Sequence, residues 1–323
     1  MHPSDTPTRP PSSTGPAFDP VALRAAWREL LARSPHLHGP EAAARLGVPE
    51  ADLLASRIGD GVRELSADLP ALLAPCADWG KLLVAARNRI GVALAILDDC
   101  TVVAGPDAVC IEAGGTAIRI DPAAASVAYL FEDHDAHGHT VSVNWFDSRG
   151  EAVGKLFLMS KSGRDRALPH LLAHAAPGAS AERRAARGPA QPRPPTVRMR
   201  GEMRASRVVE GVDARMLGER AVLERSWGAA WRVSMEAPGI GLDYTGPLAR
   251  SSHTPPAVHA NDERLKLHLR MGQAARARAG LVDAGHGALK WEDDDGGSLV
   301  LAVVDGVAAS HAWVDAMLAG RSA

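Results

Sequence analysis

The chain has 323 residues, of which 46% are hydrophobic, enough material for two globular domains with packed cores. Its 36 Lys and Arg residues nearly balance its 38 Asp and Glu residues, so the formal net charge of −2 provides no overall field to attract a polyanion. We therefore expect no nucleic-acid partner. No apolar run reaches the roughly 18 residues of a membrane-spanning helix, so we expect no part embedded in a membrane.

Cysteine usage and the N-terminal sequence both favour the cytoplasm. Cys76, Cys100 and Cys110 form neither a disulfide framework nor a C-x-x-C metal motif, so reduced thiols are expected. Residues 1–19 contain five prolines and no basic segment followed by an apolar one. They are predicted to be a disordered tail and not a secretory signal.

Helical signals come first along the folded part of the chain. Pro20 suits a first helical turn, and apolar residues follow it at helical spacing up to Leu31. Shorter helices are predicted at residues 40–46, 50–56 and 68–73.

The pattern then changes to short β-rich segments separated by Gly, Asp or Pro. Strands are predicted at residues 82–86, 92–97, 101–104, 108–112, 116–120, 127–131, 141–146 and 152–159. Residues 132–140 are predicted to be a polar hairpin loop, and a helix from about 165 to 174 closes the unit. Short connections between consecutive strands predict an antiparallel meander.

Composition changes again after residue 175. Between 175 and 200 the chain has six Arg and five Pro and few residues that pack, which is typical of a linker. The predicted organisation is a tail at 1–19, a first repeat at 20–175, a Pro/Arg-rich linker at 176–200 and a diverged second repeat at 201–323.

An internal repeat is the firmest feature of the sequence. Residues 143–147 (VNWFD) match 289–293 (LKWED), and each segment is followed three residues later by Gly. Upstream, 118–120 (IRI) match 267–269 (LHL), each with a polar residue between two aliphatic ones. In a strand this polar residue points to the opposite face from its neighbours.

The second repeat looks less complete than the first. Its closing helix is expected at 312–318, and its helical preface is reduced to about 208–225. Pro238, Gly239 and Gly241 occupy the region where the first repeat begins a regular strand, which predicts an eroded second copy.

Several motifs taken in order resemble one known family. They are 43–57 (AARLGVPEADLLASR), Arg87-Asn88, 117–120 (AIRI), 145–152 (WFDSRGEA) and 155–157 (KLF). Their order and spacing resemble the bacterial HemS/ChuX-type haemin-degrading and haem-trafficking family, whose members are themselves internal duplications.

The resemblance implies an α+β fold made of two tandem copies of a HemS-like unit, each a large antiparallel β-sheet with flanking helices. It also implies a cytoplasmic haem-utilisation protein that binds haem for intracellular transfer or degradation in iron acquisition. Haem is then the cofactor or cargo, a haem oxygenase or inner-membrane haem transporter is the implied partner, and any enzymatic activity is haem degradation.

Two site residues follow from the resemblance. Arg119 falls on the family's haem-contacting arginine, and a guanidinium suits a propionate because it donates two parallel hydrogen bonds to a carboxylate. The alternative is a structural salt bridge. His268 occupies the equivalent place in the second repeat, where it either faces the same pocket or is an ordinary strand histidine.

The family's axial histidine has no counterpart here. The family places it in a helix soon after the linker, where this chain reads RMRGEMR at 198–204 and has no histidine before His253. We therefore assign no metal ligand and no catalytic residue, although Met199 and Met203 offer thioethers. The alternative function is a non-catalytic relative that has lost axial ligation and acts as a binding or scaffold module.

Two other clusters have both a structural and a functional interpretation. His134, His137 and His139, with Asp133 and Asp135, are predicted to be a solvated loop, with transition-metal binding as the alternative. The three aspartates at 293–295 are predicted to be a surface turn, because a calcium loop spreads its ligands over about twelve residues.

Residues 45–57 have helix-turn-helix character, and they are the only basis for a DNA-binding alternative. The acidic Glu50 and Asp52 in the would-be recognition helix argue against it.

Overall fold

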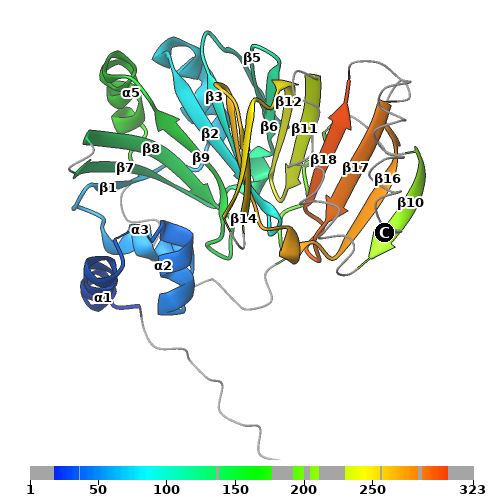
Figure 1. The fold of residues 1–323 in the computed structure, drawn as a ribbon. Helices are drawn as coiled ribbons and strands as arrows, with labels where there is room; N and C mark the ends of the chain where they lie inside the picture. Colours follow the sequence, from blue (N-terminus) through cyan, green and yellow to red (C-terminus); the bar gives the residue numbers. More distant parts are fainter. Residues whose placement is uncertain are drawn as a thin grey trace, which may run out of the picture.

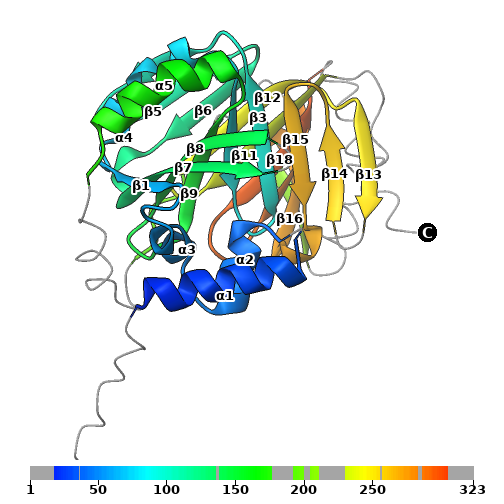
Figure 2. The same ribbon diagram turned by 90° about the vertical axis from the view of Figure 1, so that its left-hand side faces the viewer.

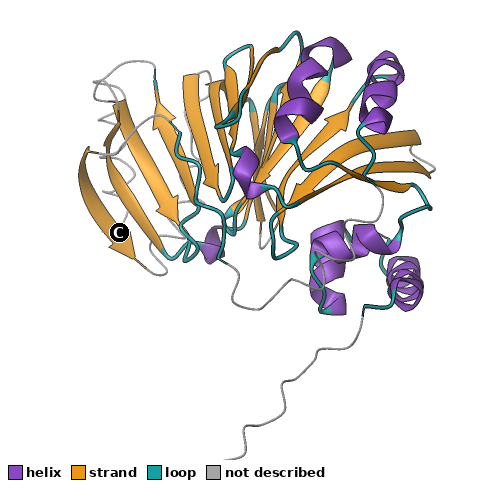
Figure 3. Cartoon of the chain, turned by 180° about the vertical axis from the view of Figure 1, so that it is seen from behind, coloured by secondary structure: helices purple, strands orange, loops and turns teal. Residues whose placement is uncertain are grey.

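The structure is a computed structural model that describes residues 18–35, 37–135, 138–176, 192–199, 204–210, 230–254, 257–282 and 286–304. These residues form two nine-stranded antiparallel sheets packed against each other, with the longer helices gathered on the first sheet (Figures 1 and 3). Within these ranges, no helix has the length and apolar character needed to cross a membrane.

The described helices are α1 (Pro20–Arg33), α2 (Gly39–Leu46), α3 (Glu50–Ser56), α4 (Leu69–Leu73) and α5 (Lys161–Ala173), with 3₁₀ turns η1 (Ala74–Trp79), η2 (Pro122–Ala124) and η3 (Met271–Gln273). The first nine strands are β1 (Val62–Leu65), β2 (Leu82–Arg87), β3 (Gly91–Leu97), β4 (Thr101–Ala104), β5 (Val109–Ala113), β6 (Thr116–Ile120), β7 (Val127–Asp135), β8 (Gly138–Phe146) and β9 (Ala152–Leu158). The second nine are β10 (Arg204–Glu210), β11 (Ala230–Ala237), β12 (Ile240–Pro247), β13 (Arg250–Thr254), β14 (Ala257–Asn261), β15 (Leu265–Leu269), β16 (Arg276–Val282), β17 (His286–Glu292) and β18 (Ser298–Val303).

Each sheet takes strands from both halves of the chain. The first has the order β1-β7-β8-β9-β2-β3-β15-β14-β13, and the second has the order β10-β16-β17-β18-β11-β12-β6-β5-β4. Strands β10–β18 therefore repeat the positions of β1–β9, and the predicted α+β fold of two tandem copies is confirmed. The two copies exchange their β4-β5-β6 and β13-β14-β15 meanders, so neither sheet is built from one copy alone (Figures 1 and 2).

Several predicted boundaries in the first half were wrong. The strand β1 was not predicted. Residues 132–135 and 138–140, predicted to be loop, extend β7 and β8, because polar side chains are tolerated where a strand continues past the core. Helix α5 begins at Lys161, earlier than predicted, because the Ser160 hydroxyl caps it by accepting a hydrogen bond from the Gly163 N–H at 3.0 Å.

The second half also departs from the prediction. Residues 208–210 were predicted to be helical and belong to strand β10. Pro238 and Gly239 form the turn of the β11–β12 hairpin, which is fully paired, so they do not mark erosion of the strands. Residues 177–191, 200–203, 211–229 and 305–323, including Met203 and the predicted closing helix, lie outside the described residues.

Part of the predicted linker packs on this hairpin. The N–H of Val197 donates to the carbonyl of Ala237 at 3.0 Å, and the N–H of Gly239 donates to the carbonyl of Pro195 at 3.0 Å. Residues 195–197 are therefore hydrogen-bonded to the β11–β12 turn at one end of the second sheet.

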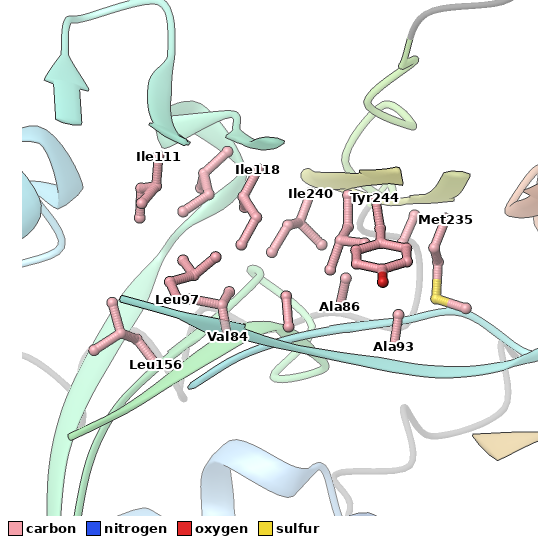
Figure 4. Packing of buried hydrophobic residues seen from close by; sticks show 14 of the residues in the cluster. Val84, Ala86, Ala93, Leu97, Ile111, Ile118, Leu156, Met235, Ile240 and Tyr244 are labelled. Atoms are coloured by element: carbon pink, nitrogen blue, oxygen red, sulfur yellow. The ribbon is translucent and has the colours of Figure 1, made fainter. Parts of the chain in front are cut away.

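The main core lies between the two sheets. Strands β2 and β3 alternate buried and half-buried residues, as expected for strands with one face on a core. Val84, Ala86 and Leu97 face Ile118 and Ile240 from the opposite sheet (Figure 4). Burial of each Val, Leu or Ile side chain contributes about 1.5–3 kcal/mol relative to exposure.

Matching aspartates close the equivalent turns of the two copies. Asp147 Oδ1 accepts from the N–H groups of Arg149 and Glu151, each at 2.9 Å. Asp293 Oδ1 accepts in the same way from Asp295 at 2.9 Å and Gly297 at 2.8 Å. The acidic turn at 293–295 thus has a structural role. Within it, the carboxylate of Asp295 pairs with Arg89 and Arg193.

Helices α1–α3 pack against β1, β7 and β8 on the outer face of the first sheet (Figure 2). Trp27 and Leu53 pack with Tyr129 and Phe146 in a second hydrophobic cluster. Six of the seven residues of α3 are buried, so this helix presents no face that a DNA groove could accept. The helix-turn-helix interpretation is therefore not supported.

Glu50 anchors α3 to the sheet beneath it. Its carboxylate is only 4% exposed and accepts from Lys155 Nζ at 2.5 Å and Arg87 Nη2 at 3.1 Å. Burial raises the pKa of Glu50, but the charges of Lys155 and Arg87 outweigh it and leave the pKa below its ordinary value. The Arg87 of the resemblance motif thus serves this ion pair.

We predict that Glu50→Gln destabilises the fold by about 3–5 kcal/mol at pH 7, because the half-buried Arg87 and Lys155 lose the buried carboxylate that pairs with both. A carboxylate with a lowered folded pKa stabilises above its unfolded pKa, and this contribution is lost as the pH falls through the folded value. Urea unfolding from pH 7 to pH 3 should therefore show a shallower decline for Glu50→Gln. The exposed Glu112→Gln is the control, and equal slopes for the two variants would contradict the prediction.

A second prediction concerns Gly154 on β9. A Cβ built there would lie 2.5 Å from the indole of buried Trp145 and 3.0 Å from Ile240 of the opposite sheet. Gly154→Ala should therefore cost about 1–3 kcal/mol in chemical unfolding, because neither neighbour can move without disturbing the core. Gly105→Ala, whose Cβ would meet an atom no closer than 3.6 Å, should be nearly neutral. Equal unfolding free energies for both variants would refute this packing explanation.

Candidate functional site

A groove of about 1,160 Å³ lies on the outer face of the second sheet, where strands of the two halves join. Strands β5 and β6 of the first half form one side of it, and β11, β12 and residues 198–199 form the other. We call it the Arg119 groove. The residues that carry the argument are Cys110, Ala117, Arg119, Met199, Arg232 and Asp243.

Arg119 reaches the groove because of strand alternation in β6. Ile118 and Ile120 are buried in the core between the sheets, so Ala117 and Arg119 point the other way. Antiparallel pairing places Arg119 opposite Cys110 of β5 on one side and opposite Gly241 of β12 on the other. A first-half arginine therefore lies in the second-half sheet.

The guanidinium of Arg119 is exposed and makes no ion pair with any residue in the described ranges. The other two arginines of the groove are engaged. Arg232 Nη2 lies 2.9 Å from Asp243 Oδ2, and Arg198 Nη1 lies 2.8 Å from Glu236 Oε2. Among the described lining residues, Arg119 is thus the guanidinium whose hydrogen-bonding fork remains open to a ligand.

Arg232, Ser234 and Asp243 form a buried polar network in the groove wall. The Asp243 side chain is 12% exposed and the Arg232 side chain 14% exposed. The Ser234 hydroxyl donates to the other carboxylate oxygen of Asp243. A charged side chain with so little exposure to solvent is stable only beside a partner of opposite charge. The network therefore fixes the floor of the groove next to Ala117, which pairs with Asp243.

Residues 198 and 199 are held against the groove by Glu236. The N–H of Met199 donates to Glu236 Oε1 at 2.9 Å, and Ser298 Oγ donates to Glu236 Oε2 at 2.6 Å. Burial raises the pKa of Glu236, but the hydrogen bonds from Ser298, Arg198 and Met199 outweigh it and lower the pKa. The absence of a Cβ at Gly241 lets the Met199 thioether pack directly on β12.

Three side chains with iron-binding atoms line the groove. They are the thiol of Cys110, the thioether of Met199 and the imidazole of His286, which is the first residue of β17. No cluster of three or more His, Cys, Asp and Glu in the described ranges has the arrangement of a metal site. The described lining therefore offers side chains that could each serve as one axial ligand of haem iron, and no group of ligands for a free metal ion.

The two predicted site residues are not brought together. His268 is in β15, which joins the first sheet beside β3, and its imidazole lies on the outer face of that sheet. There its Nδ1 is 2.8 Å from the Nδ1 of His259. Strand exchange explains the separation, because it moves β6 into the second sheet and β15 into the first.

The histidine-rich segment is only partly described. Asp133 pairs with Arg57 at 3.4 Å, and His139 Nε2 lies 3.7 Å from Glu132. His137 and the side chains of His134 and Asp135 lie outside the described residues, so the metal alternative for this segment stays a prediction.

Sequence reasoning missed Arg232, Asp243 and Cys110 as groove residues. Arg232 of β11 and Asp243 of β12 each stand between two apolar residues of their strand. This pattern predicts that they point away from the core, so it was a usable signal. Their proximity to Arg119 had no local signal, because it depends on β6 pairing with a strand more than 100 residues away.

Comparison with known proteins identifies the first half. Residues 47–173 match the model of the haemin-degrading HemS/ChuX domain. This part of the chain is a HemS/ChuX domain. It contains Arg119, the turn at Asp147 and the Arg87-Asn88 pair, on which the sequence resemblance rested. No curated protein sequence matches the chain.

Solved structures extend the likeness over nearly the whole length of the chain. Apo-PhuS, a heme-binding protein from Pseudomonas aeruginosa, matches with a TM-score of 0.72 and 19% identity, covering 92% of this chain and 99% of PhuS. Holo-PhuS gives 0.71 and 20%, covering 89% and 94%. The heme-degrading enzyme ChuS from Escherichia coli O157:H7 gives 0.71 and 15%, covering 94% and 99%. At these identities the likeness establishes the two-copy fold.

We predict that Asp243→Asn destabilises the protein by about 3–5 kcal/mol, because it removes the carboxylate that pairs with the largely buried Arg232 at 2.9 Å. Arg232→Met combined with Asp243→Asn should recover a substantial part of that loss, since the charge is then removed with its partner. Urea unfolding monitored by tryptophan fluorescence measures both. A double variant no more stable than Asp243→Asn would show that the pair does not act as a unit.

Proposed function

We propose that this protein binds haem in the Arg119 groove, as a cytoplasmic factor that transfers haem or supports its degradation in iron acquisition. The observation that carries the proposal is the guanidinium of Arg119, which makes no ion pair with a described residue and lies on the wall of a groove of about 1,160 Å³. Support also comes from the HemS/ChuX match over residues 47–173.

The groove has properties that suit a porphyrin. Ligand sites commonly have volumes of about 300–1,000 Å³, so this groove is large enough for a large planar molecule. Its lining combines apolar Ala117 and Met199 with the cation of Arg119. The apolar atoms suit the macrocycle, and the guanidinium suits a propionate, to which it can donate two parallel hydrogen bonds.

The residues for iron are less specific than those for the propionate. Haem supplies an iron atom that accepts axial ligands, and the described lining provides a thiol, a thioether and one imidazole for that role. The sequence between His174 and His253 contains no histidine. This absence favours the second candidate function, a relative that has lost axial ligation by histidine and acts as a binding module. Such a relative would hold haem through the propionates of the porphyrin.

A cytoplasmic location agrees with the chemistry of the cysteines. A hydrogen bond with Cys100 and burial raise the pKa of the Cys76 thiol, so this group stays protonated and unreactive. Free buried thiols of this kind are typical of a reducing compartment. A haem oxygenase or an inner-membrane haem transporter is the partner class that fits such a carrier.

Hemin titration followed by absorbance tests the proposal. Wild-type protein should develop a saturable Soret shift with one haem per chain. Arg119→Ala should weaken binding about 10–100-fold, because a charge-assisted hydrogen bond contributes about 1.5–3 kcal/mol. Arg63→Ala, an exposed strand arginine on β1, is the matched control and should bind like the wild type.

Esterified porphyrin isolates the propionate contact from the iron. Mesoporphyrin should bind the wild type more tightly than its dimethyl ester, and Arg119→Ala should abolish that preference. Wild-type affinity for hemin in Arg119→Ala, or an unchanged ester preference, would overturn the assignment of Arg119. A tight complex whose spectrum lacks an axial protein ligand would favour the second candidate over the first.

A further inference from the structure

A pair of facing histidines lies on the other sheet, away from the Arg119 groove. His259 of β14 and His268 of β15 are directly opposite in the antiparallel register. Their rings are nearly perpendicular, at 78°, with centroids 4.9 Å apart, and their Nδ1 atoms share a hydrogen bond of 2.8 Å, one ring donating and the other accepting. His268 is exposed and His259 is half-buried, so the pair opens to solvent.

This separation matches the distance between neighbouring ligands of one metal ion. Metal–imidazole bonds are about 2.0–2.1 Å long, so two nitrogens at a right angle lie roughly 2.9 Å apart and two at a tetrahedral angle roughly 3.3 Å apart. The observed 2.8 Å fits the right-angled case. Square-planar or tetragonal geometry with nitrogen ligands is typical of Cu(II) and Ni(II).

The charge state of the pair favours a metal. Burial lowers the pKa of His268, and the nearby His259, Lys266 and His38 lower it further. A lowered pKa keeps this imidazole neutral at physiological pH, which is the form that ligates metals. The same cationic neighbours disfavour the protonated form of His268, so a metal ion bound through its lone pair takes the place of an unfavourable proton.

The other close histidine pair of the described chain differs in its hydrogen bonds. His170 and His174 of α5 have ring centroids 4.4 Å apart. However, His170 Nε2 is 3.2 Å from the carbonyl of Ala71, and His174 Nδ1 is 3.0 Å from the carbonyl of His170. Each of these rings is oriented by the backbone, whereas the Nδ1 atoms of His259 and His268 face one another.

We propose that His259 and His268 form a surface chelate for a divalent transition-metal ion of the Cu(II) type, with water completing the coordination. No third His, Cys, Asp or Glu in the described ranges completes a cluster with them. The two protein ligands come from strands of the second half that are inserted into the first sheet, so the site is separate from the Arg119 groove.

Calorimetric titration of the haem-free full chain with CuCl₂ in a weakly competing buffer tests the site. His259→Gln and His268→Gln should each remove one equivalent of copper or weaken it by more than about 10–100-fold, the range seen when a supporting partner of a metal ligand is removed. The double variant should lose no more than either single one, because a chelate needs both nitrogens. His2, beside the amino terminus, is kept in all variants as a constant background.

His170→Gln is the matched control and should retain the equivalent that the two strand variants lose. Arg119→Ala should also retain it, which separates this site from the haem proposal. Wild-type copper stoichiometry and affinity in His259→Gln or His268→Gln would overturn the proposal, as would an equal loss in His170→Gln. Circular dichroism of each variant verifies that the sheets remain folded, since both side chains lie on the solvent face.

Discussion

The pairing of β6 with β12 is the constraint on which the architecture of this protein depends. Five residues of β6, Thr116–Ile120, pair antiparallel with Ile240–Tyr244 of the other half. The equivalent pairing of β15 with β3 joins the halves a second time. Because each sheet is completed by a meander from the other copy, the hydrophobic core between the sheets is built from residues of both copies.

The same exchange creates the candidate site. A HemS/ChuX domain contributes Arg119, but the wall opposite it, with Arg232 and Asp243, belongs to the second half. Side chains on the core face of β6 secure the strand, which leaves the alternate residues free to face the groove. Strand pairing over a long sequence distance thus positions the guanidinium of Arg119, which forms no ion pair within the described part of the chain.

The two copies use the same scaffold with different chemistry at equivalent places. Arg119 faces Cys110 across β5 and β6, and His268 faces His259 across β14 and β15. Charge is also rearranged at the outer ends of the sheets. In the first copy the carboxylate of Glu50, on a helix, forms ion pairs with two cations of the sheet. In the second copy the carboxylate of Glu236, on a strand, forms an ion pair with Arg198 of the segment that was predicted to be a linker. The duplicated backbone therefore supports two distinct outer faces.

Local sequence predicted most strands and helices of the first half, the antiparallel pairing and the repeat. Alternation in β6 and the turn aspartates Asp147 and Asp293 are encoded within a few residues, so their roles were readable from spacing. Only the tertiary structure decided that Arg119 and His268 lie on different sheets, and that 192–199 packs on the hairpin of β11 and β12. The physical reason is that strand exchange links residues more than 100 positions apart, and side-chain periodicity within a strand carries no information about which strand will be its neighbour.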